Sequence, residues 1–257
     1  MPERDLDDFL DAYGDGFAHA FDNRIIQAWY PERIIRACDA DSRSLELGVG
    51  HGRSTARLAR HFREHVVVEG SPAIIRQFAR DHPHSGAIVE QALFERYRPD
   101  APFDVIVCGF VLEHVDDPVA LLRRCRDWLT ARGRCFVAVP NGESLHRRVG
   151  HAAGLLADPL ALGPGDHALG HRRQYSVARL DRELAAAGFR VVRREGVFMK
   201  ALTTAQLRSL ELDEAVLRAL CEVAVDYPEL SCALLFEAIP ERGAREGPGV
   251  EPDGGRR

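Results

Sequence analysis

Three glycines at alternate positions form the clearest candidate binding site in the sequence. Gly48, Gly50 and Gly52 follow a short apolar segment, and an acid, Glu46, lies two residues before the first of them. Because glycine lacks a Cβ atom, the backbone here can turn sharply and lie against a ligand. A helical pattern over Arg53–Phe62 follows directly, and the start of a helix offers unpaired N–H groups to a ligand. The loop is therefore predicted to bind a ligand of nucleotide size.

A second acid lies where the ribose of a nucleotide would need a partner. Glu69 ends the apolar run that begins at Val66, and Gly70 follows it. A carboxylate at the end of a strand beside a glycine loop can accept hydrogen bonds from both ribose hydroxyls. The glycine spacing bears on the type of nucleotide, since dinucleotide folds use G-x-G-x-x-G and Arg53 stands in place of their third glycine. An NAD(P)-dependent oxidoreductase is thus the less favoured alternative.

Histidines supply the candidates for acid–base chemistry. His114 follows the apolar segment Phe103–Phe110, and His171 lies beside a pair of arginines, Arg172 and Arg173. An imidazole titrates near neutral pH, where a base that deprotonates a hydroxyl must work. We therefore expect His171 to be a general base or an acceptor-orienting group, with His114 as its competitor. A purely structural role for His114, in which its ring holds the turn by hydrogen bonds, is equally open.

A divalent metal is a further possibility in the segment 142–175. Asp166, His167 and His171 offer atoms that could ligate such an ion. The two histidines would share a face only if this stretch were helical, and Gly170 disfavours a helix. We therefore predict no metal.

Arginines near the same segment could surround an anionic group of an acceptor, because guanidinium forks suit carboxylates and phosphates. Coding bias is the competing explanation, since lysine occurs only once, as Lys200, among the 34 basic residues. We assign no chemistry to Lys200, which most simply ends a strand. An anionic acceptor is therefore one of two interpretations of four arginines: Arg147, Arg148, Arg172 and Arg173.

The residues named so far lie at the ends of short apolar segments that alternate with helical patterns. The predicted strands are Ser44–Val49, His65–Glu69, Ala87–Ala92, Phe103–Phe110 and Arg134–Pro140. The predicted helices between them are Arg53–Phe62, Pro72–Asp81 and Pro118–Thr130. Such alternation is typical of a parallel sheet with crossover helices, and hence of a doubly wound α/β domain.

The flanking segments complete one domain over residues 1–240. Residues 1–40 are predicted to form N-terminal helices, and residues 241–257, rich in glycine, proline and charge, a disordered tail. The segment 142–175 is longer than an unstructured loop usually is, so we predict a lid insertion with short helices on the carboxyl side of the sheet. The remaining predicted elements are the helix Val177–Ala187, the strand Phe189–Arg194, the helix Thr204–Val225 and the strand Cys232–Ile239.

Together these segments resemble class I S-adenosylmethionine-dependent methyltransferases. The glycine loop resembles the E/D-x-G-x-G-x-G motif of that family, and Phe103–Pro118 resembles its fourth strand and turn, F-D-x-I-x-x-x-x-x-L-E-H-x-x-D-P. Val139–Asn141 matches the P-N that ends its fifth strand, with Arg132 in place of one upstream glycine. The lid end, Gly170–Tyr175, resembles a bacterial small-molecule subgroup associated with polysaccharide or natural-product biosynthesis. The likeness is close over residues 40–141.

The resemblance implies a Rossmann-like methyltransferase fold, in which a doubly wound, seven-stranded, mostly parallel sheet has an antiparallel last strand. It also implies S-adenosylmethionine as the cofactor. The turn after the third strand packs against adenine in this family, which makes Leu93 the candidate here, although the family's usual acid is missing at this point. The implied cofactor-binding residues are Glu46, Gly48, Gly50, Gly52, Glu69, Gly70, Leu93 and Gly109.

The activity implied by the resemblance is methylation of a small molecule, at oxygen rather than nitrogen. The acceptor would be a hydroxyl or carboxylate of a sugar or natural-product intermediate. Two alternatives stay open, the oxidoreductase and a catalytically silent S-adenosylmethionine-binding protein. The sequence specifies neither the identity of the acceptor nor the oligomeric state.

The composition argues against several other classes of protein. A net charge of −5 at pH 7 disfavours a nucleic-acid partner, because phosphates normally require a basic face. No apolar run approaches the ~20 residues of a membrane span, and the N-terminus is acidic, unlike a signal peptide. With 46% hydrophobic residues, the chain can bury a sizeable core. We therefore expect a cytoplasmic protein that uses no membrane.

Overall fold

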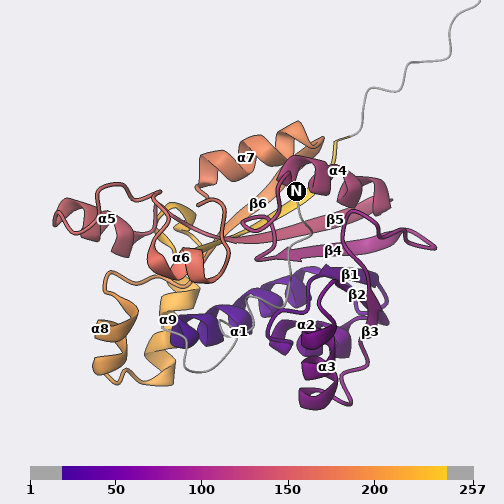
Figure 1. The fold of residues 1–257 in the computed structure, drawn as a ribbon, viewed down its shortest axis with the longest axis horizontal. Coiled ribbons are helices and arrows are strands. Elements are labelled where there is room, and N and C mark those ends of the chain that lie inside the picture. Colours follow the sequence, from indigo (N-terminus) through magenta and orange to yellow (C-terminus); the bar gives the residue numbers. More distant parts are fainter. Residues whose placement is uncertain (1–18, 242–257) are drawn as a thin grey trace, which may run out of the picture.

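Seven strands form one sheet in the computed structural model, which describes residues 19–241 (Figure 1). Their order across the sheet is β3-β2-β1-β4-β5-β7-β6. The first five pair in parallel, whereas β7 runs antiparallel to both of its neighbours. This confirms the predicted seven-stranded, mostly parallel sheet with an antiparallel last strand. The strands are β1 Arg43–Leu47, β2 Glu64–Glu69, β3 Ile88–Gln91, β4 Phe103–Gly109, β5 Leu129–Pro140, β6 Phe189–Val197 and β7 Ala233–Pro240.

Helices cover both faces of this sheet (Figure 1). α1 (Ala20–Ala37), α2 (Arg53–His61) and α3 (Pro72–Asp81) lie on one face, opposite α4 (Pro118–Trp128) and α7 (Val177–Ala186). In β4, Val105 and Val107 join the apolar cluster that includes α1, while Ile106 and Cys108 join the cluster of α4 and α7. Because both faces are covered, the sequences of the central strands are continuous apolar runs.

The loops that follow β2 and β4 are fixed by the starts of the next helices. α3 begins at Pro72 with the hydroxyl of Ser71 as its cap, and α4 begins at Pro118 with the carboxylate of Asp117 as its cap. Proline suits the first helical position because its missing N–H would have no helical partner there, and the cap satisfies a later N–H. The loops after β2 and β4 are thus held close to the carboxyl edge of the sheet.

One predicted element in the C-terminal third is wrong. The single helix predicted over Thr204–Val225 is interrupted at Glu211, whose φ of 46° is incompatible with a right-handed helix, and a new helix begins after Asp213. The two helices are α8 (Thr204–Ser209) and α9 (Glu214–Ala224), followed by a 3-10 turn, Pro228–Leu230. α4 also ends earlier than predicted, at Trp128, because Leu129 is extended and begins β5.

The segment 142–175 leaves and rejoins the sheet at one point. The N–H of Gly142 donates to the carbonyl of Tyr175 at 2.8 Å, and Asn141 forms a parallel bridge with Tyr175. Between these ends the segment carries the two short helices α5 (Leu145–Ala152) and α6 (Pro164–Ala168). Short helices were predicted there, whereas gating by this segment stays a prediction.

Two predictions concern residues outside the described range. The N-terminal helices are described only from α1 onward, so residues 1–18 lie outside it, and the predicted tail lies outside it from residue 242. Within residues 19–241, no helix combines the length and the apolar character needed to cross a membrane.

Candidate functional site

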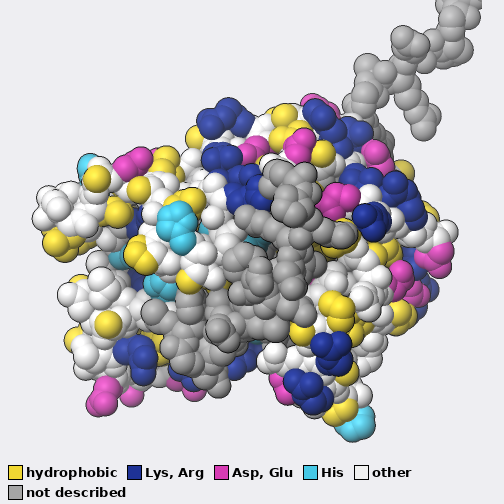
Figure 2. All heavy atoms as spheres, viewed as in Figure 1, with side chains coloured by type: hydrophobic (Ala, Val, Ile, Leu, Met, Phe, Trp, Pro, Cys, Tyr) yellow, Lys and Arg dark blue, Asp and Glu magenta, His cyan; other side chains and the backbone are white. Residues whose placement is uncertain are grey.

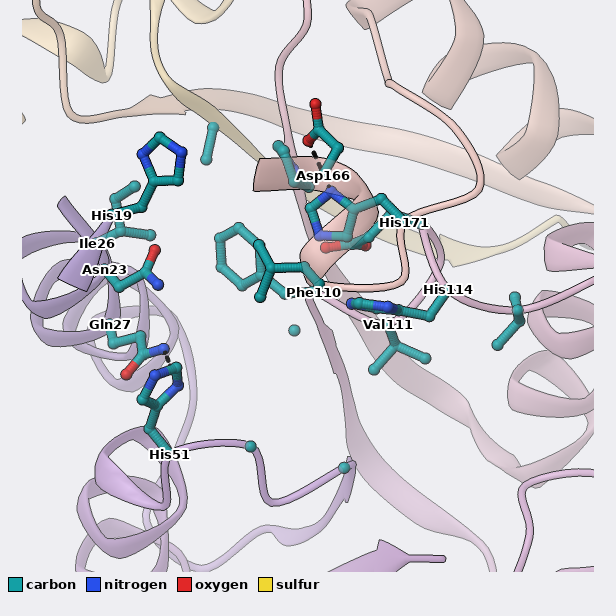
Figure 3. Close-up of a pocket in the computed structure, with 18 of the residues that line it drawn as sticks. His19, Asn23, Ile26, Gln27, His51, Phe110, Val111, His114, Asp166 and His171 are labelled. Carbon is teal, nitrogen blue, oxygen red and sulfur yellow. Dashed lines mark hydrogen bonds and ion pairs between the residues drawn. The ribbon is translucent and has the colours of Figure 1, made fainter. Parts of the chain in front are cut away.

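A cavity of about 600 Å³ lies along the carboxyl ends of β1, β2, β4 and β5 (Figure 3). Open parallel sheets bind their ligands at this edge, and the volume suits a small molecule. One wall comes from the loops after β1 and β2, and the facing wall from the loop after β4 together with α6 and the chain after it. α1 contributes a third side.

The glycine loop has the left-handed backbone that its sequence predicts. Gly48, Gly50 and Gly52 have φ angles of 79°, 54° and 75°, which side chains with a Cβ rarely adopt. Gly48 and Gly50 line the cavity, but Gly52 is absent from the lining that the described residues form. Gly52 instead precedes α2, where a Cβ would lie 2.6 Å from the ring of Phe78. Its role is to let α3 pack against the loop.

Glu69 lies at the end of β2 and lines the cavity with Gly70. Its side chain is buried, and its two oxygens accept from backbone N–H groups, Oε2 from Val49 at 3.0 Å and Oε1 from Ser71 at 2.8 Å. The carboxylate is therefore held in a fixed position at the cavity.

Glu46 is buried beneath the same part of the cavity. Its Oε2 lies 3.2 Å from Nε2 of His65, whose Nδ1 is 2.8 Å from the hydroxyl of Ser44. Glu46 reaches the cavity as predicted, but its position is set by this chain of hydrogen bonds within the sheet.

The last two predicted cofactor residues, Leu93 and Gly109, also line the cavity. At Gly109 a Cβ would lie 2.7 Å from the hydroxyl of Tyr30, so the missing side chain lets α1 approach the end of β4. Burial raises the pKa of Tyr30, so its hydroxyl stays protonated and can donate to a ligand. The sequence did not single out Tyr30.

The two predicted catalytic histidines lie together on the facing wall (Figure 3). Their ring centroids are 4.8 Å apart, and the two ring planes make an angle of 75°. Nδ1 of His171 lies 2.9 Å from Oδ1 of Asp166. Burial alone would raise the pKa of Asp166, but the hydrogen bonds from His171 and from the N–H of Gly163 lower it. Asp166 is thus an anionic partner for the imidazole.

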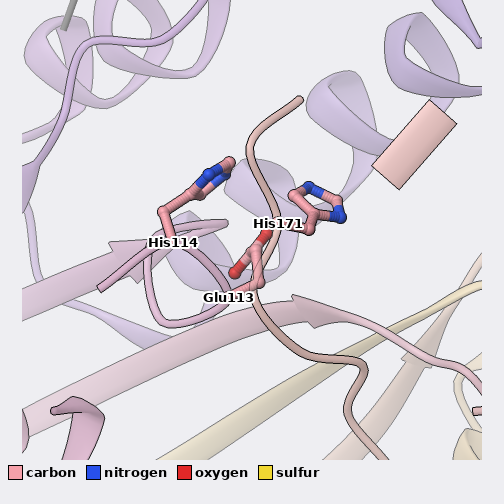
Figure 4. A group of neighbouring side chains, drawn as sticks. All are labelled: Glu113, His114 and His171. Carbon is pink, nitrogen blue, oxygen red and sulfur yellow. The ribbon is translucent and has the colours of Figure 1, made fainter. Parts of the chain in front are cut away.

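Glu113, which the sequence analysis passed over, completes this cluster (Figure 4). It is fully buried, and neither carboxylate oxygen has a hydrogen-bond partner among the described residues. Burial raises its pKa to about 7, against the opposing effects of His171 and Arg173. One donor atom from each of Glu113, His114 and His171 lies within 4.8 Å of the others. The L-E-H string contains Glu113 beside His114, so the sequence could have indicated Glu113 as a second site residue.

The alternative metal trio of Asp166, His167 and His171 is not assembled among the described residues. His167 is exposed, α6 ends at Ala168, and Gly170 has a φ of 72°. The two histidines therefore do not share a helical face, as the glycine predicts.

Helix α1 supplies a wall of the cavity that the sequence analysis missed. Gln27 reaches the glycine loop, with its Nε2 2.8 Å from Nδ1 of His51 (Figure 3). Asp22, farther along the same wall, forms a buried ion pair with Lys200. Lys200 also donates to the hydroxyl of Thr204 at 2.9 Å and lines the cavity, so it does more than end a strand. The feature of the sequence that could have pointed to Lys200 is that it is the single lysine.

The four candidate arginines all have partners within the protein, either backbone carbonyls or carboxylates. Arg147 donates from Nε to the carbonyl of Pro159 at 2.6 Å, and Arg173 donates from Nη1 to the carbonyl of Leu112 at 2.9 Å. The remaining two form ion pairs within the lid and with the turn after β4: Arg148 with Glu143 and Arg172 with Asp116. Of the four, Arg147 and Arg172 line the cavity.

Comparison with known proteins places these features in a family. A family model described as a methyltransferase domain matches residues 19–194. A ubiquinone biosynthesis O-methyltransferase of Xylella fastidiosa is 34% identical over 108 residues, which cover 39% of this chain and 42% of that protein. The chain thus spans less than half the length of the curated relatives that it matches.

Solved structures share the fold at low sequence identity. An S-adenosylmethionine-dependent methyltransferase from Mesorhizobium loti has a TM-score of 0.56 and 19% identity, covering 82% of this chain and 99% of that one. A 1,6-didemethyltoxoflavin-N1-methyltransferase from Burkholderia thailandensis, with 1,6-didemethyltoxoflavin and S-adenosylhomocysteine bound, has a TM-score of 0.58 and 17% identity, covering 91% and 86%. At such identities the likeness establishes the fold.

Proposed function

This chain belongs to the family of methyltransferase domains, and on that premise we propose that it transfers a methyl group from S-adenosylmethionine to an oxygen atom of a small-molecule acceptor. The acceptor oxygen attacks the methyl carbon while the C–S bond breaks, and the electron pair of that bond leaves on sulfur as S-adenosylhomocysteine. A sulfonium methyl is already activated, so the protein mainly aligns the reacting atoms at about 3 Å and excludes water. Family membership favours this reaction over the NAD(P)-dependent alternative.

The adenosyl half of the cofactor would lie over the loop after β1. Support comes from Gly48 and Gly50, which present bare backbone to the cavity, and from the fixed carboxylate of Glu69. A carboxylate at the end of a strand beside a glycine loop accepts hydrogen bonds from ribose hydroxyls in dinucleotide-binding folds, and Glu69 has that position here. Leu93 lines the same cavity, and adenine would pack there.

The observation that carries the acceptor side is the bonded pair of His171 and Asp166 on the facing wall. When Asp166 accepts from Nδ1–H, Nε2 of the neutral imidazole keeps its lone pair. That nitrogen can take the proton of an acceptor hydroxyl as the new C–O bond forms. We therefore assign His171 as a general base or acceptor-orienting group, and His114 as the ring that restricts its orientation.

The partners of the cavity-lining arginines favour an acceptor that bears a hydroxyl over one that must carry an anionic group. The cavity-lining Arg147 and Arg172 are already engaged by a backbone carbonyl and by Asp116. The relatives named as O-methyltransferases support oxygen as the acceptor atom. On the face that Figure 2 shows, basic side chains of the described residues are interspersed with acidic ones, which together with the net charge of −5 supports a small molecule over a nucleic acid.

Single-turnover methyl transfer tests this proposal. S-adenosylmethionine with a radiolabelled methyl group is incubated with a panel of hydroxylated sugars and aromatic metabolites, and label in extracted product is counted. We expect His171→Gln to bind S-adenosylhomocysteine as the wild type does and to transfer methyl groups ~10²–10⁴-fold more slowly, the usual contribution of a general base.

His167→Gln is the matched control, because His167 is exposed on the same lid. It should react at the wild-type rate. Equal rates for His171→Gln and the wild type at saturating acceptor would exclude the assigned role. Binding of the cofactor without label transfer to any acceptor of the panel would favour the silent binding protein.

A further inference from the structure

A buried carboxylate and two imidazoles meet on the acceptor wall of the cavity (Figure 4). Glu113, His114 and His171 each offer a donor atom within 4.8 Å of those of the other two. We propose that these three side chains bind a divalent transition-metal ion of the Zn²⁺ type. Two nitrogen donors and one carboxylate oxygen form a donor set that such ions take in proteins.

The carboxylate of Glu113 provides the strongest argument for a cation. It is fully buried, and both of its oxygens lack a hydrogen-bond partner among the described residues. Burying a polar group without a partner is costly, and such a group in a native structure calls for an explanation such as a bound ion. A cation between Glu113 and the two histidines would satisfy those oxygens.

Asp166 acts on this site through His171. Its Oδ1 lies 2.9 Å from Nδ1 of His171. An outer carboxylate that accepts from one ring nitrogen fixes the tautomer and turns the other nitrogen toward a metal. Nε2 of His171 is thus the donor that the cluster would use.

The two segments that carry the donors are tied together by the backbone. The N–H of Arg172 donates to the carbonyl of Glu113 at 2.9 Å, and the guanidinium of Arg173 donates to the carbonyl of Leu112. The turn after β4 and the end of the lid therefore hold the donors at fixed separation. A site whose donors are preorganised needs little rearrangement to bind an ion.

Three protein donors leave a coordination position open on the cavity side, as in catalytic metal sites. Resting on the proposed function, a hydroxyl oxygen of the acceptor would occupy that position, where the cation favours loss of the hydroxyl proton to water, because the Nε2 lone pair of His171 would be on the ion. His171 would then serve as a ligand that orients the acceptor, and the class of acceptor would be one with an accessible hydroxyl.

Metal titration of the whole chain tests the site without any acceptor. Protein freed of metal by chelation and dialysis is titrated with Zn²⁺ by calorimetry and with Co²⁺ by visible absorption. We expect one equivalent to bind the wild type. Asp166→Asn should weaken binding by about 10–100-fold, the usual effect of losing an outer partner, and Glu113→Gln or His114→Gln by more. His167→Gln, which alters the exposed histidine, should bind as the wild type.

Several results would overturn the site. They are the absence of stoichiometric binding, an equal loss of affinity in His167→Gln, and a Co²⁺ spectrum dominated by thiolate charge transfer, which would indicate cysteine ligands. If Glu113→Gln does not fold, His114→Gln and Asp166→Asn carry the same comparison. S-adenosylhomocysteine binding is measured on the same samples: its failure contradicts the proposed function, whereas its success without metal binding contradicts only the metal site.

Discussion

At the end of β2, one carboxylate accepts from the N–H groups of Val49 and Ser71 and also lines the cavity. Glu69 therefore links the shape of the glycine loop to the ligand that lies on it. Because it acts on both, its substitution should weaken binding through the lost ribose hydrogen bonds and through a looser loop. Charge-assisted hydrogen bonds of this kind contribute about 1–3 kcal/mol each.

We expect Glu69→Gln to raise the Kd of S-adenosylhomocysteine by about 5–150-fold, which corresponds to that range of free energy. Isothermal titration calorimetry measures this Kd for the wild type and the variant. Glu90→Gln, which changes an exposed acid on the neighbouring strand β3, is the control and should leave the Kd unchanged. Tight binding of NADH with no binding of S-adenosylhomocysteine would contradict the cofactor assignment.

Among the elements, the segment 142–175 is the one that we predict to move as a lid. No side chain of α5 or α6 is buried by the residues that the structure describes, whereas Gly142 and Tyr175 anchor the ends of the segment. Arg147 joins two parts of the lid through the carbonyls of Pro159 and Ala161. Elements with few buried contacts open at low free-energy cost. The lid can thus move as a unit about anchored ends.

Hydrogen exchange followed by mass spectrometry checks whether the lid moves. Amides of residues 145–168 should exchange faster than those of α4 in the ligand-free protein and should slow when cofactor and acceptor are both bound. α4, whose inner side chains are buried, serves as the internal reference. Strong protection of 142–175 that is equal with and without ligands would exclude a gating role.

On the scale of the whole molecule, the polar interior of the cavity makes stability depend on pH. Burial, with a smaller effect of the nearby Lys200, lowers the pKa of His146 to about 4 from an unfolded value of 6.5. Between these two pH values the unfolded chain binds a proton that the folded protein excludes. The free energy of unfolding therefore falls as the pH drops from 6.5 towards 4.

Urea unfolding at pH 7 and pH 5 measures this effect. Because His146 is only partly buried, we expect it to contribute about 1 kcal/mol to the loss of stability of the wild type over this interval. His146→Gln should lose less stability over the same interval, since glutamine does not titrate. His151→Gln, an exposed histidine of the lid, is the matched control and should behave as the wild type. An identical pH dependence in His146→Gln and the wild type would contradict the assignment.

The sequence by itself determined the features that depend on neighbours along the chain. Alternating apolar segments and helical patterns predict the doubly wound sheet, because periodicity reports which faces are covered. The glycines at 48 and 50 predict a left-handed loop, since few other residues adopt that backbone. Glu69 followed from its place at a strand end. The break at Glu211 was missed because a non-glycine residue with positive φ has no clear local signal.

Only the tertiary structure decided which distant residues share the site. Glu113 and His171 come from segments far apart in sequence, and their meeting depends on how the lid rejoins the sheet. The sequence predicts that Lys200 ends a strand, whereas the fold also places it beside Asp22 of α1. The sequence predicts ligand contact for Gly52, whereas in the structure its missing side chain makes room for Phe78. Local patterns arise from backbone geometry, whereas burial and charge pairing arise from long-range packing, which no single segment encodes.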